Sequence, residues 1–520
     1  MTTVSAERVE SAGGRSADGG TAFLPAGDPN SAAAPKAVGF ARMWPEWAAI
    51  AAYTVLLAFA ISRHEPFSDE AQAWQLARTL PLSTLFKTYI GYEASPGLWH
   101  ILLWIMTRVH IGYAGMHWVC GVFAITAQLL LLHRSPFPRY LKLALPFTNF
   151  FLYQYAVVGR SYVLAPLLLF LIAIYWKKGP IRVAILLGLL ANVSLHLAVL
   201  SGGLAIVYCM GGGKANAGRN RPGYRGLAPF LLVLAAFYSF AIWTAWPPAD
   251  LVLSHLRGQS RPMFAFGLAS LTFGIGQPWI LSIAFWIAIG FCLRARRAML
   301  FLVPVGLFAC FSGLVYAQFW HAGLLVPFLV AVLWITWPEA AMDSPKPELA
   351  GRAAVAMMIA VQLLWSAFAL NWDLGHAYSG DPAAAQFLEP FVHRHARILV
   401  TWVNEADARA FDSVGILPYF DHNPYQNVSK PFWWWSEKND TQQRFDRLLP
   451  ERPEILLVET RLQPHETLDL NQPGFERLRQ SGYRLTNSFC GTIPIQMELG
   501  LTSCHMIFQP AEESPSGRRQ

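Results

Sequence analysis

The sequence predicts a polytopic α-helical membrane protein that carries a separate, extracytoplasmic α/β domain at its C-terminus. Of its 520 residues, 54% are hydrophobic and only 14% are charged, whereas a soluble domain carries about 25% charged residues. The hydrophobic residues form runs of membrane-spanning length rather than amphipathic stripes. After residue 370 the chain becomes charged and is punctuated by proline. A membrane part followed by a soluble part is therefore expected.

The net charge of +8 does not indicate a nucleic-acid partner. The Lys and Arg residues cluster in short loops between apolar segments, where they orient membrane helices. Membrane lipids are the expected surroundings of the chain, and no nucleic acid is expected to bind.

Three regions follow one another along the chain. Residues 1–42 are rich in Ala, Gly and Ser and lack an apolar run, which predicts a disordered cytoplasmic tail and not a cleavable signal peptide. Residues 43–372 are predicted to form the transmembrane domain, and residues 373–520 the soluble domain. The transmembrane domain contains about 11–12 apolar segments, at residues 47–61, 98–106, 118–132, 141–158, 163–176, 181–197, 200–210, 227–246, 271–293, 299–316, 324–337 and 353–370.

The positive-inside rule predicts which loops face the cytoplasm. The basic loops are residues 133–142, 177–182, 211–225, 293–297 and 338–352. The alternate loops then face outward, and they are residues 67–96, the corners at 160 and 196, residues 247–270 and residues 318–323, together with the chain after 370. Segment 98–106 is too short for a core about 30 Å thick, so this sidedness requires a single net crossing between residues 98 and 132, for example with a re-entrant piece.

The soluble domain shows short β-like runs at residues 398–403 and 454–458, separated by helical stretches. With about 145 residues it is large enough to bury its own core. Cys490 and Cys504 are its two cysteines. A disulfide between them would require an oxidising compartment, and two unpaired buried thiols are the alternative.

The first outward loop carries three acids. Asp69 and Glu70 follow the first apolar segment directly, and Glu93 precedes the next one. Acidic side chains at the mouth of a membrane helix are costly, which makes them functional candidates. The alternative for Asp69 is that it caps a short helix over residues 70–80, where an acid favours the positive end of the helix dipole.

The other outward corners add cations, imidazoles and aromatic rings. Arg160 lies between Tyr155 and Tyr162, and His321 lies in a later corner. Further basic residues are His196, His255, Arg257 and Arg261. Such a set suits the transfer of a group carried on a lipid phosphate. Arg160 and His321 would bind the phosphate, a carboxylate would act as base or position a divalent metal, and aromatic rings would pack against sugar or prenyl chain.

Structural alternatives exist for several of these residues. Arg160 could be an interface anchor that extends its guanidinium to the membrane surface. His100, His196 and His321 could be satisfied structural histidines. The run Trp433-Trp434-Trp435 could form a sugar platform, but its members point in different directions, and core packing or membrane contact explains it equally well.

The first loop resembles that of the GT-C class of membrane glycosyltransferases. The shared pattern is an Asp-Glu pair, a helix at residues 71–80, an acid, and Pro96-Gly97-Leu98-Trp99 opening the next segment. This class includes the protein O-mannosyltransferases and the aminoarabinose transferase of lipid A. The corner at residues 155–162 is similar to the Tyr- and Arg-rich second outer loop of bacterial members. The resemblance covers residues 47–176 by motif and the rest by architecture.

The resemblance implies a polyprenyl-phosphate sugar as donor, an inverting transfer, and Asp69 as the catalytic carboxylate. The residues expected to bind substrate are Glu70, Glu93, Tyr155, Arg160, Tyr162 and His321. Several members of the class place an acid in the second outer loop, where this chain has Arg160. A divalent metal bound through Asp69 is therefore left open as a cofactor.

The expected protein is a glycosyltransferase of the inner or plasma membrane whose active site faces the periplasm or the cell exterior. The alternative is a polytopic lipid or sugar transporter or flippase. A transporter should show internal repeats, broken helices and charges near the bilayer midplane, whereas the charges here lie at helix ends and no repeat is seen. A receptor or scaffold would have no reason to concentrate acids in the first loop. The sequence does not specify the sugar or the acceptor.

Overall fold

The computed structural model describes residues 43–211, 224–251, 263–292, 295–315, 318–340, 345–402, 412–436, 448–462 and 466–511. The predicted tail at residues 1–42 lies outside these ranges, and so do His255, Arg257 and Arg261. Residues 45–520 belong to one compact unit.

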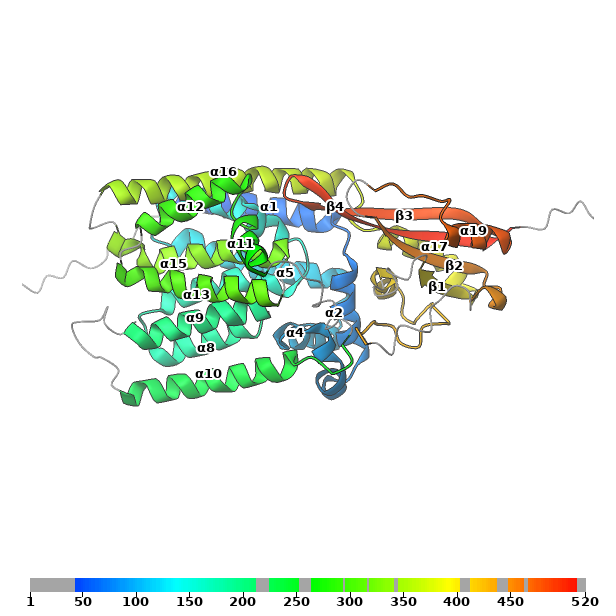
Figure 1. Cartoon of the computed structure of the whole chain (residues 1–520), viewed down its shortest axis with the longest axis horizontal. Coiled ribbons are helices and arrows are strands. Elements are labelled where there is room, and N and C mark those ends of the chain that lie inside the picture. The colour runs from blue at the N-terminus through cyan, green and yellow to red at the C-terminus, as the bar shows by residue number, and fades with distance from the viewer. Residues whose placement is uncertain are drawn as a thin grey trace, which may run out of the picture. The chain divides into compact units, whose positions relative to one another are not determined.

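Most of the described chain is helical (Figure 1). The helices are α1 (Trp44–Arg63), α2 (Ser68–Thr79), α3 (Leu82–Thr84), α4 (Leu98–Arg108), α5 (Tyr113–Arg134), α6 (Arg139–Ala144), α7 (Leu164–Tyr175), α8 (Pro180–Ala191), α9 (Leu195–Gly211), α10 (Tyr224–Ala245), α11 (Met263–Phe273), α12 (Trp279–Cys292), α13 (Ala295–Leu314), α14 (Phe319–Ala322), α15 (Leu325–Ala340), α16 (Pro345–Gly375), α17 (Asp381–His393) and α19 (Pro473–Gln480). α16 thus continues slightly beyond the predicted domain boundary at residue 372.

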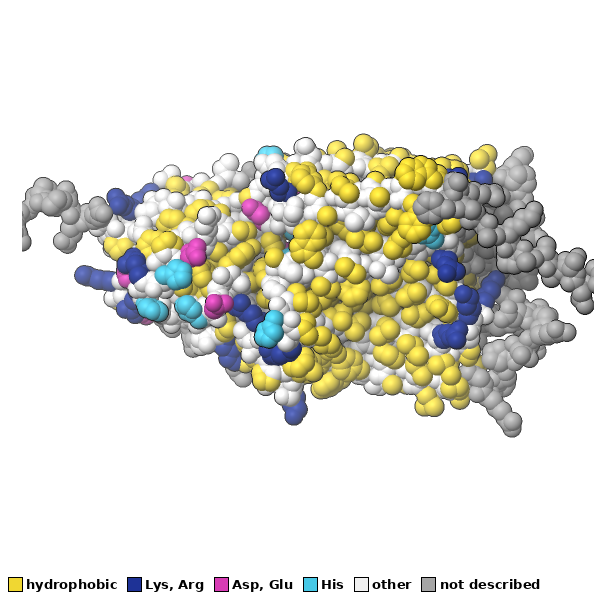
Figure 2. Space-filling view, turned by 180° about the vertical axis from the view of Figure 1, so that it is seen from behind, with side chains coloured by type: hydrophobic (Ala, Val, Ile, Leu, Met, Phe, Trp, Pro, Cys, Tyr) yellow, Lys and Arg dark blue, Asp and Glu magenta, His cyan; other side chains and the backbone are white. Residues whose placement is uncertain are grey.

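Within the described residues, five helical stretches are long and apolar enough to cross a membrane, at residues 44–63, 113–134, 227–245, 319–337 and 349–375. Shorter apolar helices pack among them: α8 contacts α9 and α10, α13 contacts α9, and α7 lies between α5 and α15. Figure 1 shows these helices side by side. Figure 2 shows one face of the molecule, where hydrophobic side chains cover the helical part and acidic side chains lie over the sheet part.

The short segment after residue 97 does not form a membrane-length helix. α4 has 11 residues and packs against α2, while the following α5 has 22 residues and is long enough to span. The stretch 98–132 therefore contains one membrane-length helix, and the single net crossing stays a prediction.

A four-stranded sheet forms the C-terminal part, with the strand order β1-β2-β4-β3. Its strands are β1 (Ile398–Trp402), β2 (Ile455–Leu462), β3 (Tyr483–Ile495) and β4 (Glu498–Pro510). β1 pairs with β2 in parallel, and the other two pairings are antiparallel. β1 and β2 correspond to the two runs predicted from sequence, whereas the long β3–β4 hairpin was not predicted.

Side chains alternate between the two faces of this sheet, because successive strand residues point to opposite sides. On one face, Val400 and Leu457 belong to a cluster that includes Leu388 of α17. On the other face, Leu399 and Leu456 belong to a cluster that α19 covers. A helix over each face gives the α/β architecture that the sequence predicted for this region.

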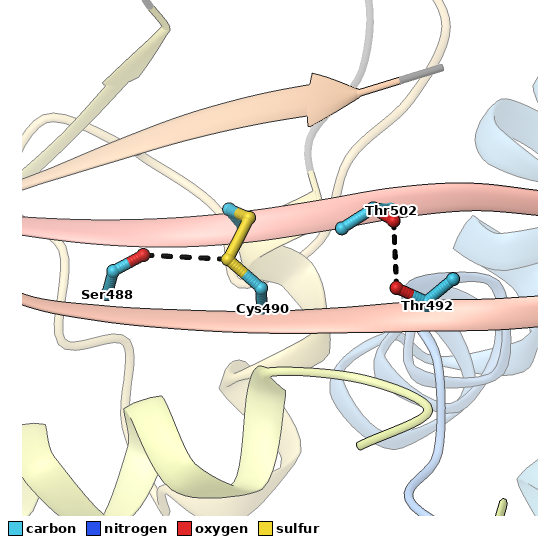
Figure 3. Close-up of a disulfide and its surroundings, with 5 residues drawn as sticks. Ser488, Cys490, Thr492 and Thr502 are labelled. Carbon is cyan, nitrogen blue, oxygen red and sulfur yellow. Dashed lines mark hydrogen bonds between the residues drawn. A yellow bond between two sulfur atoms is a disulfide. The ribbon is translucent and has the colours of Figure 1, made fainter. Parts of the chain in front are cut away.

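Cys490 and Cys504 are directly opposite each other in the β3–β4 ladder and form a disulfide (Figure 3). This settles the alternative that the sequence left open. The next pair on the same face of the hairpin is Thr492 and Thr502, which lie two positions from the disulfide on their strands. Their hydroxyl oxygens are 2.8 Å apart. The hairpin also contacts the helical part, because Trp372 of α16 donates its indole N–H to the Thr492 carbonyl at 3.0 Å.

Candidate active site

A cavity of about 260 Å³ lies between the first loop, the corner at Arg160 and the C-terminal region. It is smaller than the 300–1,000 Å³ typical of drug-sized ligands, and it suits one small polar group such as a monosaccharide or a phosphate. Its wall combines acids, cations, imidazoles and aromatic rings. The members with such side chains are Asp69, Glu93, Arg160, Arg461, His100, His196, His321, Trp99, Tyr162, Trp320, Trp433 and Trp435.

Asp69 occupies the first turn of α2 without capping it. The N-cap residue is Phe67, and its backbone N–H donates to the Glu70 carboxylate at 2.8 Å. Asp69 instead lines the cavity, where its Oδ2 lies 2.9 Å from Arg160 Nη1. The capping alternative for Asp69 is therefore wrong, and Glu70 performs that task.

Glu70 does not line the cavity but is buried beneath it, with an exposed fraction of 1%. Its Oε1 lies 2.9 Å from His117 Nε2, and its Oε2 lies 3.7 Å from His64 Nε2. His64 Nδ1 in turn lies 2.9 Å from Asp373 of α16. The network ties His64, the residue that follows α1, to α2, α5 and α16. The predicted substrate contact of Glu70 is not seen, and its place indicates a structural role.

Within this buried network, the surroundings of Glu70 and His64 favour the ionised forms of these two residues. Burial alone would raise the pKa of Glu70, but hydrogen bonds and charge interactions with His117 and His64 outweigh it and hold that pKa below its usual range. Burial likewise opposes protonation of His64, yet Asp373 and Glu70 together raise its pKa to about 10. Glu70 and His64 are therefore buried charges that compensate each other.

The Arg160 corner is fixed by its contact with the same network. The backbone N–H of Gly159 donates to Glu70 Oε1. A Cβ at residue 159 would lie 2.8 Å from His117 Nε2 and 2.9 Å from Glu70 Oε1, so only glycine fits here. The guanidinium of Arg160, the next residue, lies over the rings of Tyr162 and Trp320, 5.4 and 5.7 Å from their centroids. Arg160 is thus held between two aromatic rings and Asp69.

Glu93 is half-buried at the cavity wall. Its Oε1 accepts a hydrogen bond from Gln72 Nε2 at 3.0 Å. Burial, and next the charge of Asp69, raise its pKa to about 7, although Gln72 and Arg160 oppose the shift. Near neutral pH this carboxyl can therefore donate a proton in a hydrogen bond as well as accept one.

His321 and His196 form a stacked pair in the cavity wall, with ring centroids 4.2 Å apart and planes inclined by 11°. His321 Nδ1 accepts the backbone N–H of Gln318 at 3.1 Å, which assigns the proton of its neutral ring to Nε2. Tyr162 packs edge-on against His321. Both predicted residues, Tyr162 and His321, therefore lie in the cavity.

Tyr155 does not line the cavity. It is buried, and its hydroxyl donates to the carbonyl of Trp320 at 2.6 Å. Its ring packs against Phe150 and Tyr162. The predicted substrate contact of Tyr155 is not seen, and it supports two wall residues instead.

Sequence reasoning missed Gln72, Arg461 and the buried partners of Glu70. Gln72 could have been predicted from the sequence, because residues three apart on a helix share a face and Gln72 follows Asp69 by three. Arg461 lies on β2, far along the chain, and no local pattern connects it to the first loop. Among the described residues, no group of three or more His, Cys, Asp or Glu side chains is arranged to hold a metal ion. The metal at Asp69 therefore stays a prediction.

Comparison of the chain with protein-family models, curated proteins and solved structures found no match.

Proposed function

We propose that the protein is a membrane glycosyltransferase of the GT-C kind, which moves a sugar from a polyprenyl-phosphate donor to an acceptor hydroxyl. The observation that carries the proposal is the composition of the cavity wall. Two carboxylates, two guanidinium groups, two stacked imidazoles and several aromatic rings meet around about 260 Å³. A base, anion-binding groups and apolar ring faces are the parts that this transfer requires.

In the proposed reaction, the acceptor hydroxyl oxygen attacks the anomeric carbon of the sugar. The bond from that carbon to the phosphate oxygen breaks, and its electron pair leaves with the polyprenyl phosphate. Asp69 takes the proton of the hydroxyl. Attack opposite to the leaving phosphate inverts the anomeric configuration.

Arg160 and His321 are proposed to hold the donor phosphate. Before substrate arrives, Arg160 is engaged with Asp69 at 2.9 Å. The phosphate of the incoming donor is a diester with one negative charge and two free oxygens, which suit a bidentate contact with the guanidinium, and Asp69 is then released to face the acceptor. Glu93, whose pKa lies at about 7, is proposed to hydrogen-bond a sugar hydroxyl.

The proposed location is the inner or plasma membrane, with the cavity facing the periplasm or cell exterior. Five membrane-length apolar helices support insertion. Large apolar side chains such as Phe59, Val122 and Leu232 are 48%, 62% and 72% exposed, and lipid would cover such a surface. The Cys490–Cys504 disulfide supports an oxidising compartment for the C-terminal domain.

The proposal is tested with protein in lipid nanodiscs, radiolabelled polyprenyl-phosphate glucose, mannose, galactose and arabinose, and a membrane extract as the source of acceptor. Release of free polyprenyl phosphate with one of these donors is expected. A transporter or flippase would instead leave each donor intact, and that result would contradict the proposal.

A further inference from the structure

The three consecutive tryptophans after Phe432 are separated by the fold. Trp433 and Trp435 line the cavity. Trp434 lies on the other side, where its ring centroid is 5.7 Å from that of Tyr89 and 5.9 Å from that of Phe432. Such alternation is expected of an extended segment, in which residues two apart share a face. Two of the three tryptophans therefore belong to the cavity wall, and Trp434 packs against other aromatic rings.

The segment that carries the two tryptophans is fastened at both ends. The Trp433 backbone N–H donates to Gln72 Oε1 at 2.9 Å, and the Trp433 carbonyl accepts from Gln72 Nε2. The same Gln72 amide donates to Glu93. Beyond Trp435, the Ser436 hydroxyl donates to Asp250 Oδ2 at 2.7 Å. The segment that contains Trp433 and Trp435 is thus held against the face of α2 that carries Asp69 and Gln72.

The residues of the cavity wall differ in the ligand groups that they favour. The ring faces of tryptophan carry negative charge density, so they attract C–H groups and cations and disfavour a phosphate. Arg160 and His321, by contrast, favour the anion. A prenyl chain would fit the indoles but would offer no hydrogen-bond partner to the Glu93 carboxyl, which lines the same cavity. A sugar ring satisfies both, because it has C–H faces and an edge of hydroxyls.

We infer that Trp433 and Trp435 form the sugar-binding wall of the cavity, so that the C-terminal domain selects the pyranose or furanose that is transferred. One face of the sugar packs on the indoles, and its hydroxyls meet the Glu93 carboxyl, which Gln72 holds in place. The inference rests on the proposed glycosyl transfer and deepens it.

Trp435 is the better residue to change, because it is half-buried whereas Trp433 is 7% exposed and belongs to the domain core. Protein in lipid nanodiscs, free of glycoside detergents, is titrated with methyl glycosides of glucose, mannose, galactose and arabinose. Binding is followed by saturation-transfer NMR. At least one glycoside should bind. Trp435→Ala should weaken that binding on the order of tenfold, and Trp435→Phe, which keeps a flat apolar face, should weaken it about threefold or less.

Trp434→Phe is the matched control and should bind as the wild type does, since Trp434 faces away from the cavity. Unchanged binding in Trp435→Ala, or no binding of any glycoside to the wild type, would overturn the inference. The assay does not require turnover, so it separates the two claims. Glycoside binding that depends on Trp435, in a protein that never releases polyprenyl phosphate, would keep the sugar-binding wall and reject the transferase.

Discussion

Asp69 and Arg160 form an ion pair at 2.9 Å in the wall of the cavity, although they come from different loops of the chain. Their side chains are 47% and 29% exposed, and pairs of such exposure contribute only about 0–1 kcal/mol to stability. Stability therefore gives little reason for the pair to exist. A pair that is weak and accessible can exchange partners, as binding of a phosphate would require.

Replacing Arg160 should weaken donor binding more than it slows the chemical step. A group that holds the phosphate in both the ground state and the transition state contributes uniform binding, so its loss raises KM more than it lowers kcat. Arg160→Ala should show this in steady-state kinetics with varied donor, and Arg160→Lys should restore part of the affinity. Arg394→Ala is the control, because Arg394 pairs with Glu454 on the surface. A donor KM that Arg160→Ala leaves unchanged would assign the arginine to interface anchoring.

Glu93 should make the stability of the protein fall as the pH rises. Its folded pKa of about 7 lies above the ordinary value of 4.5, so the unfolded chain loses the proton first. The loss of folding stability caused by Glu93 therefore grows from about pH 4.5 to pH 7 and is complete above that range. Glu93→Gln cannot ionise and keeps an acceptor for Gln72.

The midpoint of thermal unfolding, measured across this pH range, should rise in Glu93→Gln relative to wild type as the pH increases. The same substitution at the exposed Glu498 of β4 tests whether the effect belongs to position 93. A difference between Glu93→Gln and wild type that does not change with pH would show that Glu93 ionises freely.

The buried carboxylate of Glu70 should be required for the folded structure. Glu70→Gln keeps the size but removes the charge that compensates His64. Breaking a buried pair typically costs about 3–5 kcal/mol, so a clear drop in Tm is expected. Glu389→Gln is the control, because Glu389 is exposed and its one described ion pair is with His393. An unchanged Tm in Glu70→Gln would contradict the assignment of the network.

The same network has a pH window. Glu70, with its pKa held below the ordinary 4.5, contributes stability above that value and loses it in acid. His64, raised from 6.5 to about 10, contributes fully below pH 6.5 and loses its contribution as the pH approaches 10. The contribution of the network should therefore be greatest between pH 4.5 and 6.5, and Glu70→Gln should flatten the dependence of Tm on pH in acid.

The sidedness of the chain is open to a direct test. Alkaline phosphatase becomes active only where its own disulfides can form. A fusion after Gly380 should therefore be active, and a fusion within residues 211–225 should be inactive. The opposite pattern would place Asp69 and the C-terminal domain on the cytoplasmic side and would contradict the proposed site.

The sequence predicted the helical class, the C-terminal α/β part and a grouping of Asp69 with Arg160 on one side of the helices, because hydropathy and loop charge constrain which ends of helices share a side. It did not predict the ion pair between them. It did not separate Asp69 from Glu70. Adjacent helix residues point about 100° apart, so only one of the two can face the cavity while the other enters the interior.

The remaining parts of the site have no local signature. Trp433 and Trp435 reach the cavity because their segment pairs with Gln72, and such tertiary contacts are not encoded in periodicity. The β3–β4 hairpin was missed since its first strand alternates weakly, with many half-buried polar residues. Glu70 was assigned to substrate because His117, to which its Oε1 bonds, lies 47 residues away in sequence, and no local pattern connects the two.

The activity of Asp69→Asn tests the central claim most directly. The substitution keeps the size of the side chain and removes its charge and basicity, and α2 is capped by Glu70, so the protein should fold normally. A positioned base contributes about 10²–10⁴-fold, and release of polyprenyl phosphate by purified Asp69→Asn should fall by that factor, with Tm and membrane levels unchanged. Glu93→Gln should lose less. Activity of Asp69→Asn within about threefold of wild type, far outside the range expected for loss of a base, would contradict the account.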